Sequence, residues 1–161
     1  MVSLKRARKR VGISGNQQEF AHALEHLLLI EEPVIDDLIH VFDEHDPILC
    51  QLVMPVLVKA GDKRALPHIV AAMGDEKDEV CDAATWGASQ FGKVAIPFLL
   101  EAIKSENPRQ RKYAARGLGQ IQDASVVNDL VTLLKDRDVK VQLAALSALG
   151  DIGDVKAVEH I

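Results

Sequence analysis

The sequence predicts an all-α fold of stacked helix pairs, an α-solenoid. Alanine, valine, isoleucine and leucine supply nearly all of its apolar residues, and aromatic residues make up only 4% of the 161 positions. Apolar residues recur at i, i+3, i+4 and i+7, as on one face of a helix. The same pattern returns about every thirty residues, which is typical of a repeat array.

Each predicted unit contains a helix A, a short turn, a helix B and a second turn. Helix A is expected over residues 65–73, 95–103 and 126–134. Helix B is expected over 80–92, 110–122 and 141–153, with Ala84, Ala114 and Ala145 at equivalent places. Because one such pair cannot bury its apolar face alone, neighbouring pairs must stack to form a continuous core.

Glycines recur inside the predicted B helices. Gly87 and Gly117 hold equivalent positions in two successive units. A glycine inside a helix costs about 1 kcal/mol relative to alanine. The recurrence therefore predicts that helices approach each other closely at these two positions.

The pattern continues toward the N-terminus. Residues 33–42 are expected to form a helix A and 46–60 a helix B, in which Pro55 predicts a kink or a break. Residues 17–30 predict a further helix, capped by Asn16 or Ser14. The sequence therefore predicts a basic, flexible N-terminus over 1–14 and one repeat domain over 15–161, with units 33–61, 62–92, 93–122, 123–153 and a partial unit 154–161.

Charge is distributed unevenly along the chain, whose net charge is -5. Five basic residues lie within residues 5–10, whereas the remainder carries 14 basic and 24 acidic side chains. An acidic body is a poor match for a nucleic-acid backbone, which disfavours that partner. The basic segment could contact phosphate, acidic lipid or an acidic protein, but such a segment is more often a solvated terminus.

Several features bear on compartment and chemistry. No apolar run approaches the roughly 18 residues that a membrane span needs, and no secretory signal pattern follows the basic segment. The chain has only two cysteines, Cys50 and Cys81, so a cytoplasmic location is expected. Helix axes pack about 8–10 Å apart, whereas a disulfide needs Cα atoms within about 7 Å, so no disulfide is expected between these two cysteines.

Two segments resemble a known repeat family. Residues 139–154 and 109–122 are similar to HEAT-like repeats of the short bacterial and archaeal form named after phycobilisome (PBS) lyases. The resemblance is clear over 62–161 and fainter over 17–61. It implies a right-handed superhelix whose commonest role is a protein-binding scaffold. It also leaves an alternative open, a lyase-like or chaperone-like subunit that binds a tetrapyrrole or another small ligand.

Catalytic and metal chemistry find little support. The resemblance includes iron-binding hydroxylases that carry His-Glu dipeptides, but this sequence has none. His22 and His26 lie four residues apart around Glu25 and could face one metal ion, although a site also needs a third ligand. We expect a solvated helix face there instead, with no bound metal, no cofactor and no catalytic residues.

Residues outside the core stripe of the B helices define the candidate binding face, which the resemblance implies is the concave one. Three rows follow from the register: Cys50, Cys81, Arg111 and Gln142; Gln51, Asp82, Lys112 and Leu143; Pro55, Trp86, Arg116 and Ser147. Trp86 is the only tryptophan and is predicted to lie near enough to Arg116 to stack. The alternative is that Trp86 seals the joint between repeats.

We expect Trp86 and Arg116 to anchor a protein partner, because tryptophan and arginine are typical interface anchors. Arg111, Lys112, Asp82 and Gln51 would set charge and hydrogen bonding. Ion pairs between repeats are expected for Glu79 with Arg109 and for Asp82 with Lys112, whereas Arg111 and Arg116 have no acidic residue in register. These two arginines are therefore predicted to contact an acidic segment of the partner.

The predicted partial unit from residue 155 begins another helix A and then stops. Terminal repeats normally carry a polar outer face. An uncapped end of this kind is a candidate surface for self-association or for another partner.

Overall fold

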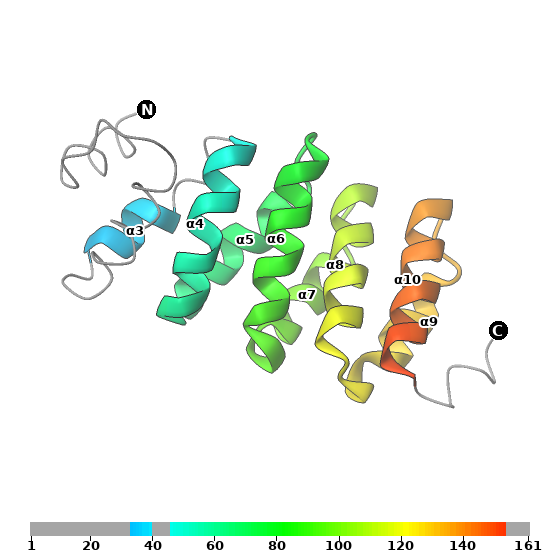
Figure 1. Ribbon diagram of the computed structural model, residues 1–161. Coiled ribbons are helices and arrows are strands. Elements are labelled where there is room, and N and C mark those ends of the chain that lie inside the picture. Colours follow the sequence, from blue (N-terminus) through cyan, green and yellow to red (C-terminus); the bar gives the residue numbers. More distant parts are fainter. Residues whose placement is uncertain (1–32, 40–45, 154–161) are drawn as a thin grey trace.

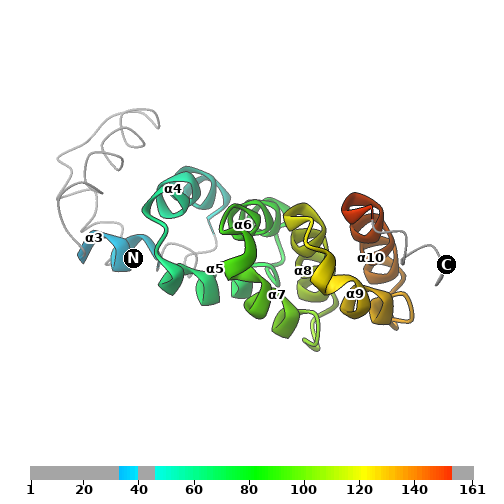
Figure 2. The same cartoon turned by 90° about the horizontal axis from the view of Figure 1, so that it is seen from below.

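The computed structural model describes residues 33–39 and 46–153, and this part of the chain contains only helices and the turns between them. The A helices are short: α3 (Pro33–Ile39), α5 (Leu66–Ala72), α7 (Ile96–Ala102) and α9 (Val127–Leu133). The B helices are longer: α4 (Pro47–Ala60), α6 (Asp78–Gln90), α8 (Pro108–Ile121) and α10 (Val139–Ile152). Helices α4, α6, α8 and α10 form one layer and α5, α7 and α9 the other (Figures 1 and 2). The predicted α-solenoid is confirmed.

Short polar residues and positive φ angles define the ends of the B helices. Asp46, Asn107 and Asp138 precede α4, α8 and α10, and each side chain accepts a hydrogen bond from a backbone N–H of the first turn. A residue with positive φ follows each B helix: Gly61, Gly92, Gln122 and Gly153. These four positions are equivalent in the repeat, so the array ends each B helix in the same left-handed turn. Only Gln122 adopts it with a side chain.

Most expected helices agree with the structure to within a few residues. A one-turn 3₁₀ helix, η2 (Lys63–Ala65), η3 (Gly92–Ala95) or η4 (Ala124–Val126), precedes each later A helix and was not expected. Of the kink or break expected at Pro55, the break is wrong, because α4 continues through this residue. The helix expected over 33–42 is described only to Ile39. The helix over 17–30, the basic segment and the partial unit lie outside the described residues.

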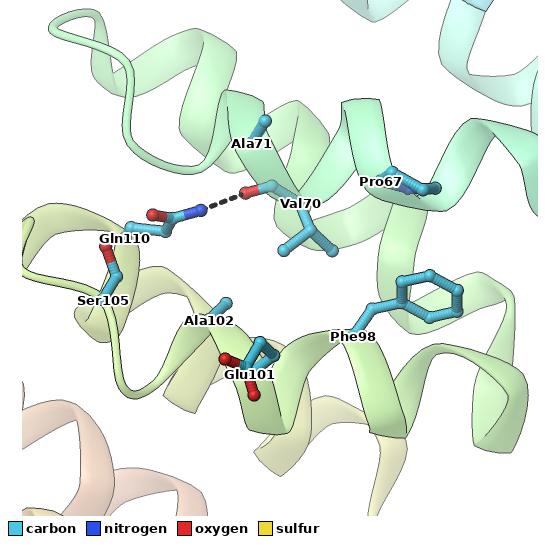
Figure 3. Close-up of a pocket in the computed structure, with 8 residues that line it drawn as sticks. All are labelled: Pro67, Val70, Ala71, Phe98, Glu101, Ala102, Ser105 and Gln110. Atoms are coloured by element: carbon cyan, nitrogen blue, oxygen red, sulfur yellow. Dashed lines mark hydrogen bonds between the residues drawn. The ribbon is translucent and has the colours of Figure 1, made fainter.

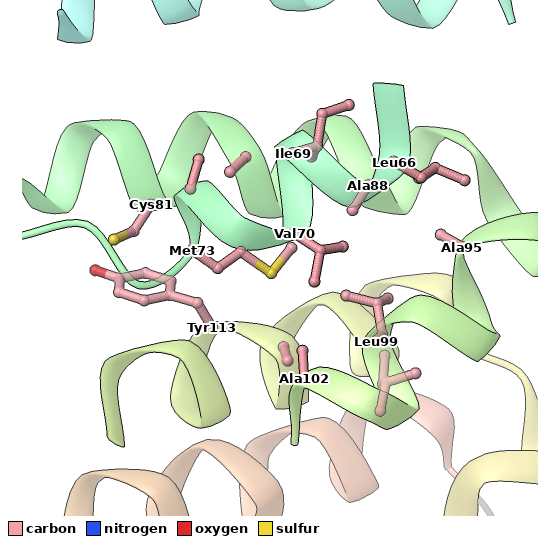
Figure 4. Close-up of a cluster of buried hydrophobic side chains, with 14 of the residues drawn as sticks. Leu66, Ile69, Val70, Met73, Cys81, Ala88, Ala95, Leu99, Ala102 and Tyr113 are labelled. Carbon is pink, nitrogen blue, oxygen red and sulfur yellow. The ribbon is translucent and has the colours of Figure 1, made fainter. Parts of the chain in front are cut away.

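The core lies between the two layers. Val70 of α5 points toward Leu99 of α7, and Met73 lies near Tyr113 of α8 (Figure 4); all four are buried. Cys50 and Cys81 are also buried, and neither forms a disulfide. Burial raises the pKa of the Cys50 thiol to about 12 and also raises the pKa of Cys81. Both thiols therefore stay protonated at neutral pH, where they act as small apolar groups.

Close helix contacts occur at some glycines and not at others. A Cβ atom at Gly87 would collide with the side chain of Met54 on α4, which confirms the close approach expected there. At Gly117 the same atom would lie 3.5 Å from the methyl groups of Leu99, which is ordinary van der Waals contact. The tightest backbone approach is at Gly119, where the added atom would lie 2.6 Å from Cα of Ala148. The expectation therefore holds for Gly87 and not for Gly117.

Candidate protein-binding face

The exposed sides of α4, α6, α8 and α10 form the surface that we call the B-helix face. Two of the three predicted rows lie on it. Gln51, Asp82 and Leu143 of the second row are exposed and Lys112 is half-buried. In the third row Pro55, Trp86 and Ser147 are exposed and Arg116 is half-buried. These rows place the predicted binding residues, apart from Arg111, on one surface.

The first predicted row lies in the core instead. Cys50, Cys81 and Arg111 are buried and Gln142 is half-buried. Each precedes its neighbour in the second row by one residue, and one residue along a helix turns the side chain by about 100°. That rotation takes this row away from solvent and toward the turns that join helix A to helix B.

Arg111 has a structural partner, contrary to expectation. Its Nε and Nη2 donate to the two carboxylate oxygens of Asp136, both at 2.8 Å, and its Nη1 donates to the carbonyls of Ser105 and Glu106. The side chains are only 6% and 8% exposed for Arg111 and Asp136. Hydrogen bonding to this arginine holds the pKa of Asp136 below its usual range. Arg111 is thus part of the joint between α8 and α10, and its prediction as a partner-binding residue is corrected.

A cluster of charges around Tyr113 joins α6 to α8. Tyr113 is buried, and its hydroxyl donates to Oδ1 of Asp78 at 2.8 Å. The same oxygen accepts from Arg109. Burial is the main cause that raises the pKa of the Tyr113 hydroxyl, whereas the hydrogen bond from Tyr113 is the main cause that lowers the pKa of Asp78. The phenol is therefore a proton donor and Asp78 a carboxylate throughout the physiological range.

Two cations lie over the ring of this tyrosine. Lys112 Nζ is 4.1 Å and Arg116 Cζ is 5.2 Å from the ring centroid. Arg116 Nη1 also donates to Oδ1 of Asp82 at 2.9 Å, with side chains that are 41% and 55% exposed for Arg116 and Asp82. The arginine therefore links its own helix α8 to α6.

The pairs differ from those expected. Arg109 pairs with Asp78 rather than Glu79, and Asp82 pairs with Arg116 rather than Lys112. The expectation that Arg116 has no acidic partner was therefore wrong. A longer side chain accounts for the second exchange, because Arg116 lies one helical turn beyond Lys112 and still reaches Asp82. Lys112 instead rests over Tyr113.

Trp86 lies on α6, one helical turn after Asp82, and it is 43% exposed. The cation–aromatic contact of Arg116 within the described residues is with Tyr113, which lies three residues earlier on the same helix, and not with Trp86. Gln51 lies on α4 and makes no hydrogen bond to the cluster within the described residues. Trp86, Arg116, Lys112 and Asp82 thus form the central part of the predicted set.

Sequence reasoning missed Tyr113 and Asp136. Tyr113 holds the repeat position that Ala83 and Ala144 hold in the neighbouring units, and a phenol among alanines was a usable signal. Asp136 lies in the turn after helix A. The equivalent positions in the two preceding units are Ser105 and Asp75. A carboxylate in that turn was the signal for a partner to Arg111.

Within residues 33–39 and 46–153, no group of three potential ligands could hold a metal ion, and His22 and His26 lie outside these ranges. No helix in the described ranges is long and apolar enough to cross a membrane. A groove of about 320 Å³ lies between α5 and α7 (Figure 3), lined by side chains that include Pro67, Val70 and Phe98. Glu101 is the one ionisable side chain among its lining residues.

Comparison with known proteins agrees with this architecture. The family model of HEAT repeats matches residues 96–161. A comparison with curated proteins finds no match.

Two solved structures are similar over 99% of this chain. One comes from work on TOG–tubulin binding specificity in microtubule dynamics and mitotic spindle formation; it is 21% identical, with a TM-score of 0.62 and 74% of its chain covered. The other is a TOG domain from C. elegans Zyg9, 18% identical, with a TM-score of 0.59 and 73% of its chain covered. At these identities the likeness shows a shared fold.

Proposed function

We propose that this chain is a non-catalytic scaffold that binds a protein partner on its B-helix face. The exposure of Trp86 carries the proposal. Trp86 is 43% exposed one helical turn after Asp82, the residue that binds Arg116, and tryptophan and arginine are the residue types that recur at interface hot spots. The HEAT repeats of residues 96–161 and the fold shared with TOG domains support a binding role. One of those relatives is described by its binding to tubulin.

The chemistry of the face favours a partner segment with acidic side chains. Lys112 makes no ion pair within the described residues and lies on an aromatic ring. Arg116 holds Asp82 through one hydrogen bond in a solvated setting, where such a pair contributes about 0–1 kcal/mol. A carboxylate on the partner can therefore replace or join Asp82 at little cost. Trp86 would contribute apolar contact area next to these cations.

Affinity capture from host lysate tests the proposal, with wild type beside the Trp86→Ala/Arg116→Glu variant. Val94→Ala is the matched control, because Val94 is also exposed but lies in η3, away from the B-helix face. We expect a protein that wild type and the control retain and the double variant loses, with equal helical circular dichroism for all three. Equal capture by all three would contradict the proposed face. A chromophore without a protein would favour the small-ligand alternative.

Tryptophan fluorescence gives a second test with the captured protein. Because Trp86 is the only tryptophan of the chain, its emission reports directly on this surface. Binding of an acidic segment that lacks tryptophan should shift the emission to shorter wavelength as water leaves the indole. An unchanged spectrum at saturating partner would place the contact elsewhere. The PBS-lyase form of the repeat, the domain limits and the cytoplasmic location remain predictions.

A further inference from the structure

The last described B helix exposes a continuous apolar stripe. Val139, Leu143 and Leu146 of α10 are 64%, 60% and 41% exposed. Gly150 continues the stripe, and no atom of the described residues lies within 4 Å of a Cβ atom built on it. At about 100° per residue these four positions point within about 60° of one another. They form one surface, which we call the α10 stripe.

Stacking of another repeat accounts for only half of this stripe. The positions equivalent to Leu146 are Met54, Thr85 and Ala115, and all three are buried beneath the next B helix. The position equivalent to Gly150 is Gly119, which receives Ala148 of α10. At these two positions the α10 stripe therefore repeats the surface through which the inner B helices stack. Leu146 provides a protruding side chain, and Gly150 leaves room for a side chain of a neighbouring helix.

The other half departs from the inner repeats. The positions equivalent to Leu143 are polar in each inner B helix and remain in contact with water: Gln51, Asp82 and Lys112. The position equivalent to Val139 is the exposed Asp78 in α6 and the exposed Pro108 in α8. Only α10 places branched apolar residues at both positions. A following repeat would leave them in water, so the stripe fits an occupant that covers all four positions.

The spacing of the stripe fits a second copy of the same helix. Successive members lie four, three and four residues apart, which is the spacing of a coiled-coil seam. In an antiparallel pair related by a two-fold axis between Ala144 and Ala145, Leu143 of each copy lies opposite Leu146 of the other. Val139 of each copy then lies opposite Gly150 of the other. The stripe is thus self-complementary, as a two-fold interface requires.

Charge supports the same arrangement. Lys140 and Asp151 flank the stripe on one side and form no ion pair within the described residues. In the antiparallel pair, Lys140 of one copy lies about 3 Å along the helix axis from Asp151 of the other, because their positions are offset by two residues. The two-fold axis keeps them on the same side of the seam. Two Lys140–Asp151 pairs would therefore flank the apolar contact.

We infer that two copies of this chain associate through the α10 stripe, with their α10 helices antiparallel. The association uses Val139, Leu143, Leu146 and Gly150 of both copies and is separate from the binding proposed around Trp86. In each copy it takes up the α10 part of the B-helix face and leaves the part around Trp86 open to a partner.

Sedimentation velocity of the full chain over a wide concentration range tests the inference. Wild type should move from the 17.6 kDa of one chain toward twice that mass as concentration rises. Leu143→Glu should abolish the dimer. Gly150→Leu should weaken it at least tenfold without loss of thermal stability, because no atom of the described residues lies close to the added side chain in the single chain. The Trp86→Ala/Arg116→Glu variant should dimerise as wild type does.

A charge exchange then tests the geometry. Lys140→Glu and Asp151→Lys should each weaken the dimer at least tenfold, and the double exchange should restore it. A wild type that stays monomeric at every concentration would overturn the inference, as would residues 154–161 or another segment occupying the stripe. A dimer that survives Leu143→Glu, or a double exchange that restores nothing, would overturn it too.

Discussion

Two of the arginines of helix α8, Arg111 and Arg116, each pair with an aspartate of a neighbouring repeat, yet their surroundings are opposite. Arg111 binds Asp136 through two hydrogen bonds, with side chains only 6% and 8% exposed. Arg116 binds Asp82 through one hydrogen bond, with side chains 41% and 55% exposed. The first pair joins α8 to the turn before α10, and the second joins α8 to α6. Residue type and repeat position alone do not separate them.

The difference teaches how one helix divides structural and binding roles. A buried carboxylate cannot recover its hydration if its arginine leaves, so the Arg111 pair is fixed. The exposed pair exchanges each contact for water at little cost, so Arg116 remains available to a partner. Burial therefore assigns Arg111 to the joint and Arg116 to the B-helix face.

Arg111→Ala should give the largest effect, because it leaves Asp136 buried without its partner. We expect a loss of about 3–5 kcal/mol in the free energy of unfolding. Urea unfolding followed by circular dichroism measures this loss. The double variant Arg111→Met/Asp136→Leu should recover most of it, since it removes both charges together. A single variant as stable as wild type would show that the pair is not buried in solution.

Gly119→Ala tests the backbone contact of the same joint. Its added methyl would meet Cα of Ala148 at 2.6 Å, and a helix backbone cannot move aside as a flexible side chain can. We expect destabilisation of about 1–3 kcal/mol. Gly117→Ala is the matched control two residues away, where the methyl finds ordinary contact with Leu99; it should be neutral or stabilising by up to about 1 kcal/mol. Equal effects of the two substitutions would contradict the difference in packing.

The sequence was sufficient for the architecture because the signals there are periodic. The spacing of apolar residues located each B helix, and equivalent small residues such as Ala84 and Ala114 set the register between repeats. It was insufficient for the pairing of charges, which depends on side-chain reach across helices. Arg111 shows this most clearly, since a rotation by one helical position separates a surface row from a buried one. Its partner Asp136 lies in a turn that the helical period does not cover.

The buried pair should also leave a trace in the pH dependence of stability. Because Arg111 lowers the pKa of folded Asp136, the pair contributes fully above the unfolded pKa of about 3.9 and loses its contribution as pH falls through the lower folded pKa. The stability difference between wild type and Arg111→Met/Asp136→Leu should therefore be constant from about pH 5 to 7 and change in favour of the variant at lower pH.

Urea titrations at several pH values measure this difference. Asp62, Asp78 and Asp123 also have pKa values below their usual range, but they are present in both proteins, so their contribution cancels. A difference that stays the same down to pH 2 would mean that Asp136 titrates alike in the folded and unfolded chain.

Arg116→Ala should have the smallest effect on folding and a larger one on binding. Its pair with Asp82 is solvated on both sides, so we expect a change of no more than about 1 kcal/mol in the free energy of unfolding. Loss of an interface anchor, in contrast, costs about 2 kcal/mol or more in binding, or roughly thirtyfold in affinity. Both quantities are measured on one variant, by urea unfolding and by titration with the captured partner.

A double-mutant cycle with Asp82→Ala separates the pair from the rest of the face. If Asp82 only competes with the partner for Arg116, its removal alone should leave affinity unchanged or raise it. If Asp82 instead positions Arg116, removing either residue should weaken binding and removing both should cost no more than removing one. The buried pair offers no such separation, because any change to Arg111 alters the fold before it can alter binding.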